Sequence, residues 1–128
     1  MQGYKPTGYP AVSPYLLVVS VEQTLAFLNA VFSATVLNKL QLADGSIKHA
    51  EVRIDDAVVM LGERPDGRAA MLSSIHVYVP DVDATYQAAL LAGAVSVAEP
   101  KDQPYGDRSA GVRDAEGNLW WLGTRLSQ

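Results

Sequence analysis

The stretch VRIDDAVVMLG at residues 52–62 returns as VRDAEGNLWWLG at residues 112–123. Both versions begin with Val-Arg, turn at an aspartate and end with Leu-Gly, and the second turn is one residue longer. Upstream, VVSVEQTL from Val18 matches VPDVDATY from Val79 at nearly the same separation along the chain. Two independent segments that share one separation indicate a duplicated structural unit.

The segments around these matches predict the order βαβββ in each unit. In the first unit, YLLVV from Tyr15 is a short buried strand, and VEQTLAFLNAVF from Val21 has the apolar spacing of a helix. Three strands follow, ATVLNKLQL, IKHAEVRI and AVVMLGE, separated by turns rich in Asp and Gly. In the second unit IHVYV repeats the strand and DVDATYQAALLAGA repeats the helix, with Asp81 as N-cap and Gly93 near the C-terminal end. The sequence therefore predicts an α+β fold of two βαβββ modules.

The length of 128 residues fits a single domain. We expect its modules at about 12–63 and 72–125, joined by a linker at 64–71 that contains Pro and Gly. Residues 1–11 carry Gly and Pro between tyrosines, which is typical of an extended arm. Such an arm is able to lie against a partner subunit.

Composition excludes several classes of protein. With 48% hydrophobic and 19% charged residues, the chain is typical of a folded globular protein rather than a disordered one. The net charge of -4 and the scattered basic residues argue against a nucleic-acid partner. The absence of cysteine excludes disulfides, thiolate metal sites and a cysteine nucleophile. Neither a signal peptide nor an apolar run of roughly 18 residues is visible, so we expect a cytoplasmic protein that has no membrane partner.

A single βαβββ module covers one face of its sheet with its helix and leaves the other face bare. Two modules that curve around a common interior make a concave cleft lined by alternate strand residues. Small ligands usually bind in clefts of this kind. The sequence therefore directs the search for function to the inward sheet faces.

Three segments carry a family resemblance: VSVEQTLAFL, HVYVPDVDATYQAALLAGA and YGDRSAGVRDAEGNLWWL. They resemble the two strand-to-helix passages and the closing hairpin of the vicinal-oxygen-chelate (VOC) superfamily of glyoxalases, bleomycin-resistance proteins and extradiol dioxygenases. The resemblance runs from about Val12 to Thr124 and implies the glyoxalase/bleomycin resistance fold, a curved mixed sheet with a concave cleft. It is less specific for activity, because this superfamily includes isomerases, lyases, dioxygenases, thiol transferases and drug-sequestering proteins.

The resemblance also locates the family's metal ligands. Metal-dependent members hold a divalent cation with four side chains, usually His, Glu or Gln, one from the first and one from the last strand of each unit. In this sequence the four positions fall at Ser13, Met60, Ser74 and Trp121. Because hydroxyl, thioether and indole groups are poor ligands for such ions, we expect no metal cofactor and a closer resemblance to the bleomycin-resistance-type binders. An alignment shift of two residues instead brings His76 to the second-unit position, since alternate strand residues share a face.

Strand alternation predicts which side chains line the cleft. If Ser13 and Ser74 point inward, so do Tyr15, His76 and Tyr78, and pairing across the 55–56 turn sets Glu51 opposite Met60. Trp121 then offers a stacking surface, whereas Trp120 belongs to the core. A loop from Pro100 brings a tyrosine and an arginine to the mouth of the cleft. The predicted ligand-binding residues are Tyr15, Glu51, Met60, His76, Tyr78, Tyr105, Arg108 and Trp121.

Several of these residues also have a purely structural interpretation. His49 and Glu51 share a strand face and are candidate catalytic residues as an acid/base couple, but Glu51 can equally pair with Arg53 or Arg108. His76 can be an interior histidine bonded to a backbone carbonyl. The alternative for Arg108 is to cap loop carbonyls or to pair with Asp107 or Asp114. The residues Asp114, Gly117 and Asn118 are assigned to turn chemistry alone.

These observations predict a homodimeric, metal-free protein that binds a hydrophobic or aromatic small molecule, with antibiotic sequestration as one use of such a site. The alternative is a VOC enzyme, a lyase, isomerase or dioxygenase, that depends on a metal or uses Glu51 and His49 as acid and base. A third class is a scaffold or regulatory partner whose cleft is closed.

Overall fold

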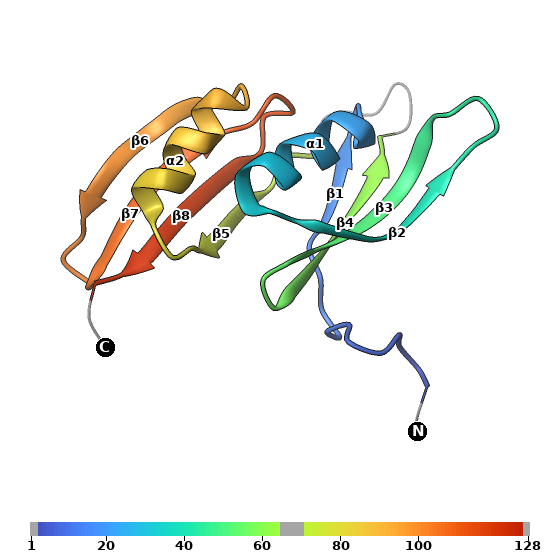
Figure 1. Cartoon of the computed structure of the whole chain (residues 1–128), viewed down its shortest axis with the longest axis horizontal. Helices are drawn as coiled ribbons and strands as arrows, with labels where there is room; N and C mark the ends of the chain where they lie inside the picture. Colours follow the sequence, from blue (N-terminus) through green and yellow to red (C-terminus); the bar gives the residue numbers. More distant parts are fainter. Residues whose placement is uncertain (1–2, 65–70, 127–128) are drawn as a thin grey trace. The chain divides into compact units, whose positions relative to one another are not determined.

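The computed structural model describes residues 3–64 and 71–126 (Figure 1). The chain divides into two compact units that follow each other in sequence, unit 1 up to residue 71 and unit 2 from residue 72. Residues 30–32, at the end of the first helix, group with unit 2. Most of the predicted linker, residues 65–70, lies outside the described residues.

Unit 1 contains one helix and a four-stranded mixed sheet. Its elements are β1 (Tyr15–Val18), α1 (Val21–Phe32), β2 (Thr35–Gln41), β3 (Ile47–Ile54) and β4 (Ala57–Glu63). The strand order is β1-β4-β3-β2, in which β1 runs parallel to β4 and the other pairs are antiparallel. Glu51 pairs with Met60 in this register, as the sequence predicts.

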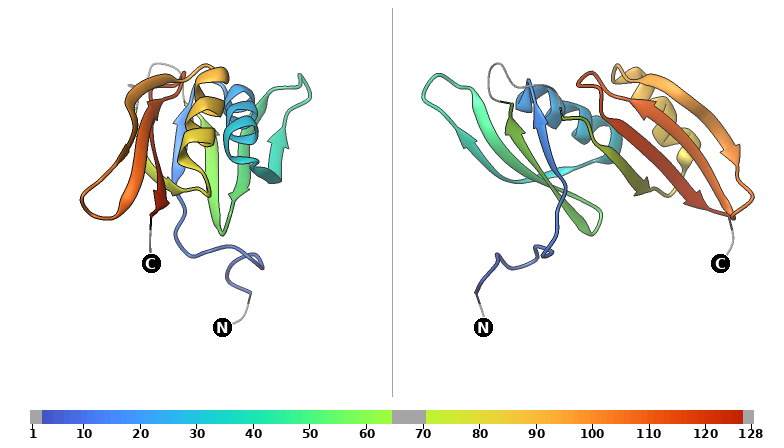
Figure 2. Two further views of the ribbon diagram at one scale, coloured as in Figure 1. Left: turned by 60° about the vertical axis from the view of Figure 1, so that its left-hand side comes forward. Right: turned by 180° about the vertical axis from the view of Figure 1, so that it is seen from behind.

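Unit 2 repeats this arrangement. Its elements are β5 (Ser74–Tyr78), α2 (Val82–Leu91), β6 (Val95–Asp102), β7 (Asp107–Arg113) and β8 (Leu119–Arg125). The order is β5-β8-β7-β6, with β5 parallel to β8, and α2 packs against β6, β7 and β8 (Figures 1 and 2). The α+β class and the order βαβββ, predicted twice from the sequence, are confirmed.

Capping residues fix the ends of both helices. The Ser20 side chain accepts a hydrogen bond from the Gln23 backbone N–H at the start of α1, and Asp81 accepts one from Ala84 at the start of α2. These bonds satisfy backbone donors that have no partner inside a helix. Gly93 follows α2 at a φ of +101°, where a residue without a side chain meets no steric cost. The predicted N-cap at Asp81 is confirmed.

No helix in the two described ranges is both long enough and apolar enough to pass through a bilayer.

The core lies on one face of each sheet. In unit 1 the buried strand residues of this face include Leu16, Val18, Ala50, Val52, Ile54, Val59 and Leu61, and in unit 2 they include Ala110, Val112, Trp120 and Leu122. Val58 is also buried, on the opposite face of the unit 1 sheet. Burial of each large apolar side chain contributes about 1.5–3 kcal/mol. Trp120 is fully buried, so its assignment to the core is confirmed.

The alternate residues lie on the opposite side of each sheet, which we call the open face. The open face of unit 1 carries Tyr15, His49, Glu51, Arg53, Met60 and Gly62, and that of unit 2 carries Ser74, His76, Tyr78, Asp107, Gly111, Trp121 and Gly123.

The segment from Pro100, expected to be a loop, is mostly a hairpin. β6 continues to Asp102, and only residues 103–106 connect it to β7. Pro100 is compatible with a strand here because β6 is at the edge of its sheet and its pairing shifts between Ala98 and Lys101.

Candidate functional site

Three side chains on the open face of unit 1 and one from the N-terminal arm form a continuous chain of hydrogen bonds. The Tyr15 hydroxyl lies 3.0 Å from His49 Nδ1, and His49 Nε2 lies 2.9 Å from Glu51 Oε2. The Tyr9 hydroxyl donates to Glu51 Oε1 at 2.6 Å. Residues from the arm, β1 and β3 therefore meet in one polar network.

The charge of Glu51 determines the direction of these bonds. The pKa of Glu51 is lowered, most by the hydrogen bond with His49 and next by the one from Tyr9. The same bond to Glu51 raises the pKa of Tyr9. Glu51 is therefore a carboxylate at neutral pH, which only accepts hydrogen bonds. His49 Nε2 must carry the proton that Glu51 accepts, so in the neutral ring Nδ1 is an acceptor and the Tyr15 hydroxyl donates to it.

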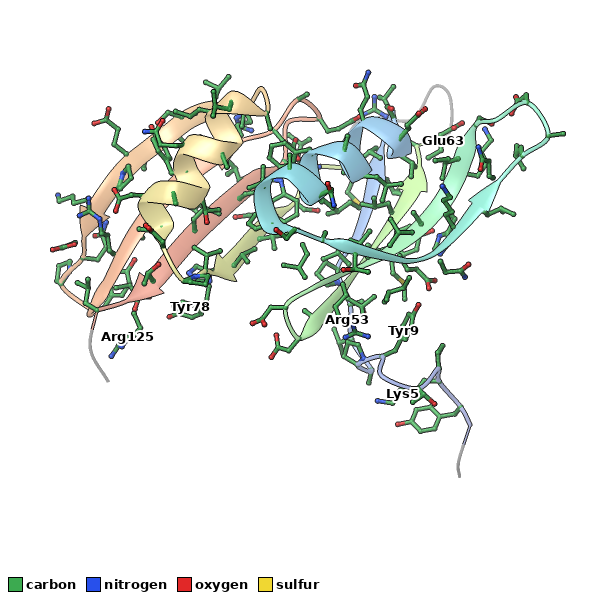
Figure 3. All side chains as sticks on the ribbon, viewed as in Figure 1. Lys5, Tyr9, Arg53, Glu63, Tyr78 and Arg125 are labelled. Carbon is green, nitrogen blue, oxygen red and sulfur yellow. The ribbon has the colours of Figure 1, made fainter. Side chains whose placement is uncertain are left out.

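The N-terminal arm is held on unit 1 at two points. Besides the Tyr9 bond, Arg53 Nη2 donates to the Gly8 carbonyl oxygen at 3.1 Å, and Figure 3 shows Tyr9 and Arg53 where the arm passes the sheet. This part of the arm contacts its own β3, although the sequence also allowed a partner subunit. The expected pairing of Glu51 with Arg53 is replaced by bonds from Tyr9 and His49.

Glycines let three aromatic rings lie flat on the sheets. A Cβ added at Gly62 would lie 2.8 Å from Tyr15 Cε1, and one added at Gly123 would lie 2.8 Å from His76 Nε2. Within unit 2, a Cβ at Gly111 would lie 2.5 Å from Trp121 Cζ3. Real Cβ atoms essentially never come this close, so any other residue would displace the ring above it. Tyr15 over Gly62 and His76 over Gly123 are equivalent pairs of the sequence repeat.

The open face of unit 2 carries a second aromatic group with a buried carboxylate. The rings of His76 and Tyr78 meet edge to face, with centroids 4.5 Å apart. The Tyr78 hydroxyl donates to Asp107 Oδ2 at 2.8 Å, and Arg125 Nη1 donates to Asp107 Oδ1 at 3.1 Å. The Tyr78 bond is the largest cause of the lowered pKa of Asp107 and of the raised pKa of Tyr78. Tyr78 and Arg125 lie at the same end of unit 2 in Figure 3.

The four family ligand positions do not fit a divalent cation. In unit 1, Ser13 Oγ is buried without a hydrogen-bond partner among the described residues, and Met60 offers a thioether. In unit 2, Trp121 Nε1 donates to Ser74 Oγ at 2.9 Å, so these two positions bond to each other. Neither position pair brings an imidazole or a carboxylate, the donors that such ions prefer. No group of three or more His, Cys, Asp or Glu that could hold a metal is found within residues 3–64 and 71–126.

Of the remaining predicted ligand-binding residues, Arg108 faces away from the open face, whereas Tyr105 lies next to the Asp107 group, because Arg125 Nη1 donates both to Asp107 and to the Tyr105 carbonyl oxygen at 2.9 Å. Arg108 lies on the helix-covered side of β7, where its guanidinium binds Asp83 of α2 and Asp102 of β6. The sequence suggested Asp107 or Asp114 as its partners. Arg108 instead reaches Asp83 and Asp102, because the even-numbered residues of β7 face α2. Tyr105 is 62% exposed in the hairpin between β6 and β7. Their roles in binding stay predictions.

Sequence reasoning missed three features of the site. The sequence placed Tyr9 in the arm without a contact of its own. Its bond joins it to Glu51, which lies 42 positions away, and no local sequence pattern predicts such a contact. Asp107 appeared only as a partner for Arg108. The glycines carried a readable signal, because Gly within a strand often marks close approach of another group. The repeated Leu-Gly pairs at 61–62 and 122–123 contain two of them.

Comparison with known proteins agrees with this fold. A model of the Glyoxalase/Bleomycin resistance protein/Dioxygenase superfamily matches residues 11–122. The uncharacterized protein Rv0887c of Mycobacterium tuberculosis is 36% identical over 125 residues, which cover 89% of this chain and 74% of that protein. The equivalent Mb0911c of Mycobacterium bovis has the same identity, with 82% of its length covered.

Solved structures share the fold of this chain. The crystal structure of TioX from Micromonospora sp. ML1 is 28% identical with a TM-score of 0.74, covering 91% of this chain and all of that one. The fosfomycin resistance protein FosX of Listeria monocytogenes, in complex with Mn(II) and sulfate, is 18% identical with a TM-score of 0.72, covering 91% of this chain and 90% of that one, and shows the common fold alone. The repeated βαβββ units and the family match over most of the chain thus lead to one conclusion: the protein belongs to the Glyoxalase/Bleomycin resistance protein/Dioxygenase superfamily.

Proposed function

We propose that this protein is a metal-independent binder of a hydrophobic or aromatic small molecule. The observation that carries the proposal is the set of aromatic rings held on the open faces although they remain accessible. Tyr15 is 50% exposed and Tyr78 is 57% exposed. Large aromatic side chains that stay accessible on one face mark a contact surface rather than a core.

The rings are also fixed in position. Tyr15 is held by His49, Tyr78 by Asp107 and Trp121 by Ser74, and glycines lie beneath Tyr15 and Trp121. A side chain that is already ordered loses little conformational entropy when a ligand packs on it. The open faces thus favour stacking of a planar or apolar ligand, with the adjacent hydroxyl, imidazole and carboxylate groups available to orient it.

The relatives are consistent with small-molecule binding. FosX is named as a fosfomycin resistance protein, and the superfamily name includes bleomycin resistance. We extend this to the present chain only as a proposal, in which an antibiotic is one candidate ligand. The homodimer expected from the family belongs to the same proposal.

Calorimetric titration with a panel of aromatic compounds and antibiotics tests binding. We expect saturable binding to one class, weakened about tenfold or more by Trp121→Ala or Tyr78→Ala, because about 1.4 kcal/mol of stacking is then lost. Leu91→Ala is the matched control, since Leu91 is 89% exposed on α2 and lies on neither open face. Binding that Trp121→Ala and Tyr78→Ala leave unchanged, or no binding across the panel, contradicts the proposal.

A metal analysis tests whether the protein is metal-independent, as the proposal states. Protein purified without chelator should contain transition metal at far below one equivalent. One equivalent of iron, nickel, zinc or manganese would instead support the metal-dependent VOC enzyme.

An acid/base enzyme is the second candidate function. The 2.9 Å bond between His49 and Glu51 favours it, since a carboxylate that orients an imidazole is the usual support of a catalytic histidine.

A further inference from the structure

Solvent exposure rises along the hydrogen-bonded network from Glu51 through His49 to Tyr15. The Glu51 side chain is 15% exposed, the His49 side chain is 27% exposed and Tyr15 is 50% exposed. The network thus runs from a sheltered carboxylate through an imidazole to a hydroxyl that solvent reaches. A small molecule on the open face of unit 1 meets the Tyr15 hydroxyl first.

The bonds assign a separate task to each group. Both oxygens of Glu51 already accept hydrogen bonds, from Tyr9 and His49, so Glu51 orients the ring and stabilises its positive charge. His49 Nδ1 has the Tyr15 hydroxyl as its hydrogen-bond neighbour at 3.0 Å and is able to take the proton. A hydroxyl bonded to an imidazole that is bonded in turn to a carboxylate is the arrangement that activates a nucleophile.

We propose that Tyr15, His49 and Glu51 form a proton relay that makes Tyr15 Oη a nucleophile toward small acyl donors such as activated esters. Tyr15 and His49 are its catalytic residues, and Glu51 is a positioning residue. This activity goes beyond ligand binding and does not depend on which aromatic compound the protein binds.

The chemical step balances without a cofactor. Tyr15 Oη forms a bond to the acyl carbon while its proton passes to His49 Nδ1. The bond from the acyl carbon to the leaving oxygen breaks, and this oxygen departs with the electron pair. The proton on His49 then passes to the leaving group or to water, which leaves an acylated tyrosine.

Gly62 positions the nucleophile. Its missing side chain is what allows the Tyr15 ring to lie on the sheet with its hydroxyl at His49. Gly62 does not have a positive φ, so alanine is compatible with the backbone there, and the atoms that its Cβ would meet are at the far end of Tyr15. Gly62→Ala should therefore fold and move the hydroxyl away from His49.

The test uses p-nitrophenyl acetate as the probe, with peptide mass spectrometry to locate and time acetylation. Tyr15 should be acetylated faster than Tyr4 and Tyr105, which are 74% and 62% exposed and serve as internal references. His49→Gln should slow acetylation of Tyr15 by roughly 100-fold, because glutamine accepts a hydrogen bond but takes no proton at neutral pH. The control Leu91→Ala, on the exposed surface of α2 and on neither open face, should leave the rate unchanged.

Gly62→Ala gives an independent result, with Leu91→Ala again as its control. The first should slow acetylation of Tyr15 and the second should not. Glu51→Gln should also slow it, while Tyr4 and Tyr105 keep their rates in every variant. Equal acetylation of Tyr15 and Tyr4 in the unmodified chain, or an unchanged Tyr15 rate in His49→Gln, overturns the relay. Because the probe need not compete with the aromatic panel, failure of the relay and failure of ligand binding are separate results.

Discussion

Glu51 shows how one partly buried carboxylate can serve both stability and chemistry. Its carboxylate joins the arm to β3 through Tyr9 and orients His49 on the same strand face. The two bonds form in the folded state only, which is why they lower the pKa of Glu51 below its ordinary value of 4.5.

This shift makes the stability of the protein depend on pH. A carboxyl whose pKa is lower in the folded than in the unfolded state adds stability above the unfolded pKa and loses it as pH falls through the folded one. The free energy of unfolding should therefore fall as pH decreases below about 4.5, and Glu51→Gln should reduce the Glu51 part of that slope. Urea denaturation at a series of acidic pH values measures this pH dependence in both proteins. An identical slope in both proteins would show that Glu51 has the same pKa folded and unfolded.

The two tryptophans predict very different costs of substitution. Trp120 is fully buried and its Nε1 donates to Asp114 Oδ2 at 2.8 Å, whereas Trp121 is half-buried and donates to the exposed Ser74. Trp120→Phe leaves a buried carboxylate oxygen without this donor and should cost about 1–3 kcal/mol. Trp121→Phe should cost less than about 1 kcal/mol, since water can replace its bond. Equal losses in chemical denaturation would contradict this assignment.

Helix α2 depends on a single side chain at its first turn. Asp81 is exposed and its carboxylate caps the Ala84 N–H, so Asp81→Ala should lower the free energy of unfolding by about 1 kcal/mol. Asp81→Asn should retain most of the stability, because its amide oxygen accepts the same bond. Thermal denaturation of the two variants makes the comparison, and a loss as large in Asp81→Asn would show that charge rather than capping matters.

The elements were predictable because each has a local cause. α1 begins and ends at the predicted residues, since its apolar spacing is a local signal. β6 runs through Pro100, where a loop was expected, because the edge position that makes Pro100 acceptable is set by the whole sheet. The register of Glu51 with Met60 followed from the short turn between β3 and β4.

The site was predictable by face but not by contact. Alternation along β3 and β5 correctly grouped His49 with Glu51 and His76 with Tyr78. The bonds of Tyr9 to Glu51 and of Tyr78 to Asp107 join residues far apart in sequence, and no spacing rule leads to them. Arg108 was assigned to the cleft from its loop, and only the extent of β7 shows which side it faces.

The two units resemble each other in fold but carry different chemistry. Unit 1 holds an ordered tyrosine, imidazole and carboxylate, and unit 2 holds an indole, an aromatic pair and a carboxylate bound by arginine. The two units thus share one framework on which the open-face residues differ.

The expected homodimer is a property of the whole molecule and is directly measurable. Sedimentation equilibrium should give twice the subunit mass of 13.7 kDa. A mass of one subunit across the concentration range would remove the homodimer from the proposal and leave both open faces to act within one chain.

The glycines beneath the rings restrict how this chain can vary. A ring at position 15 requires an absent side chain at position 62, and the pair formed by His76 and Gly123 obeys the same constraint. Enlarging the glycine alone therefore displaces the ring, whereas a joint exchange that shrinks the ring and enlarges the glycine avoids this contact. Among homologous chains, these paired sites should change together, and a glycine lost beneath a retained ring should be rare.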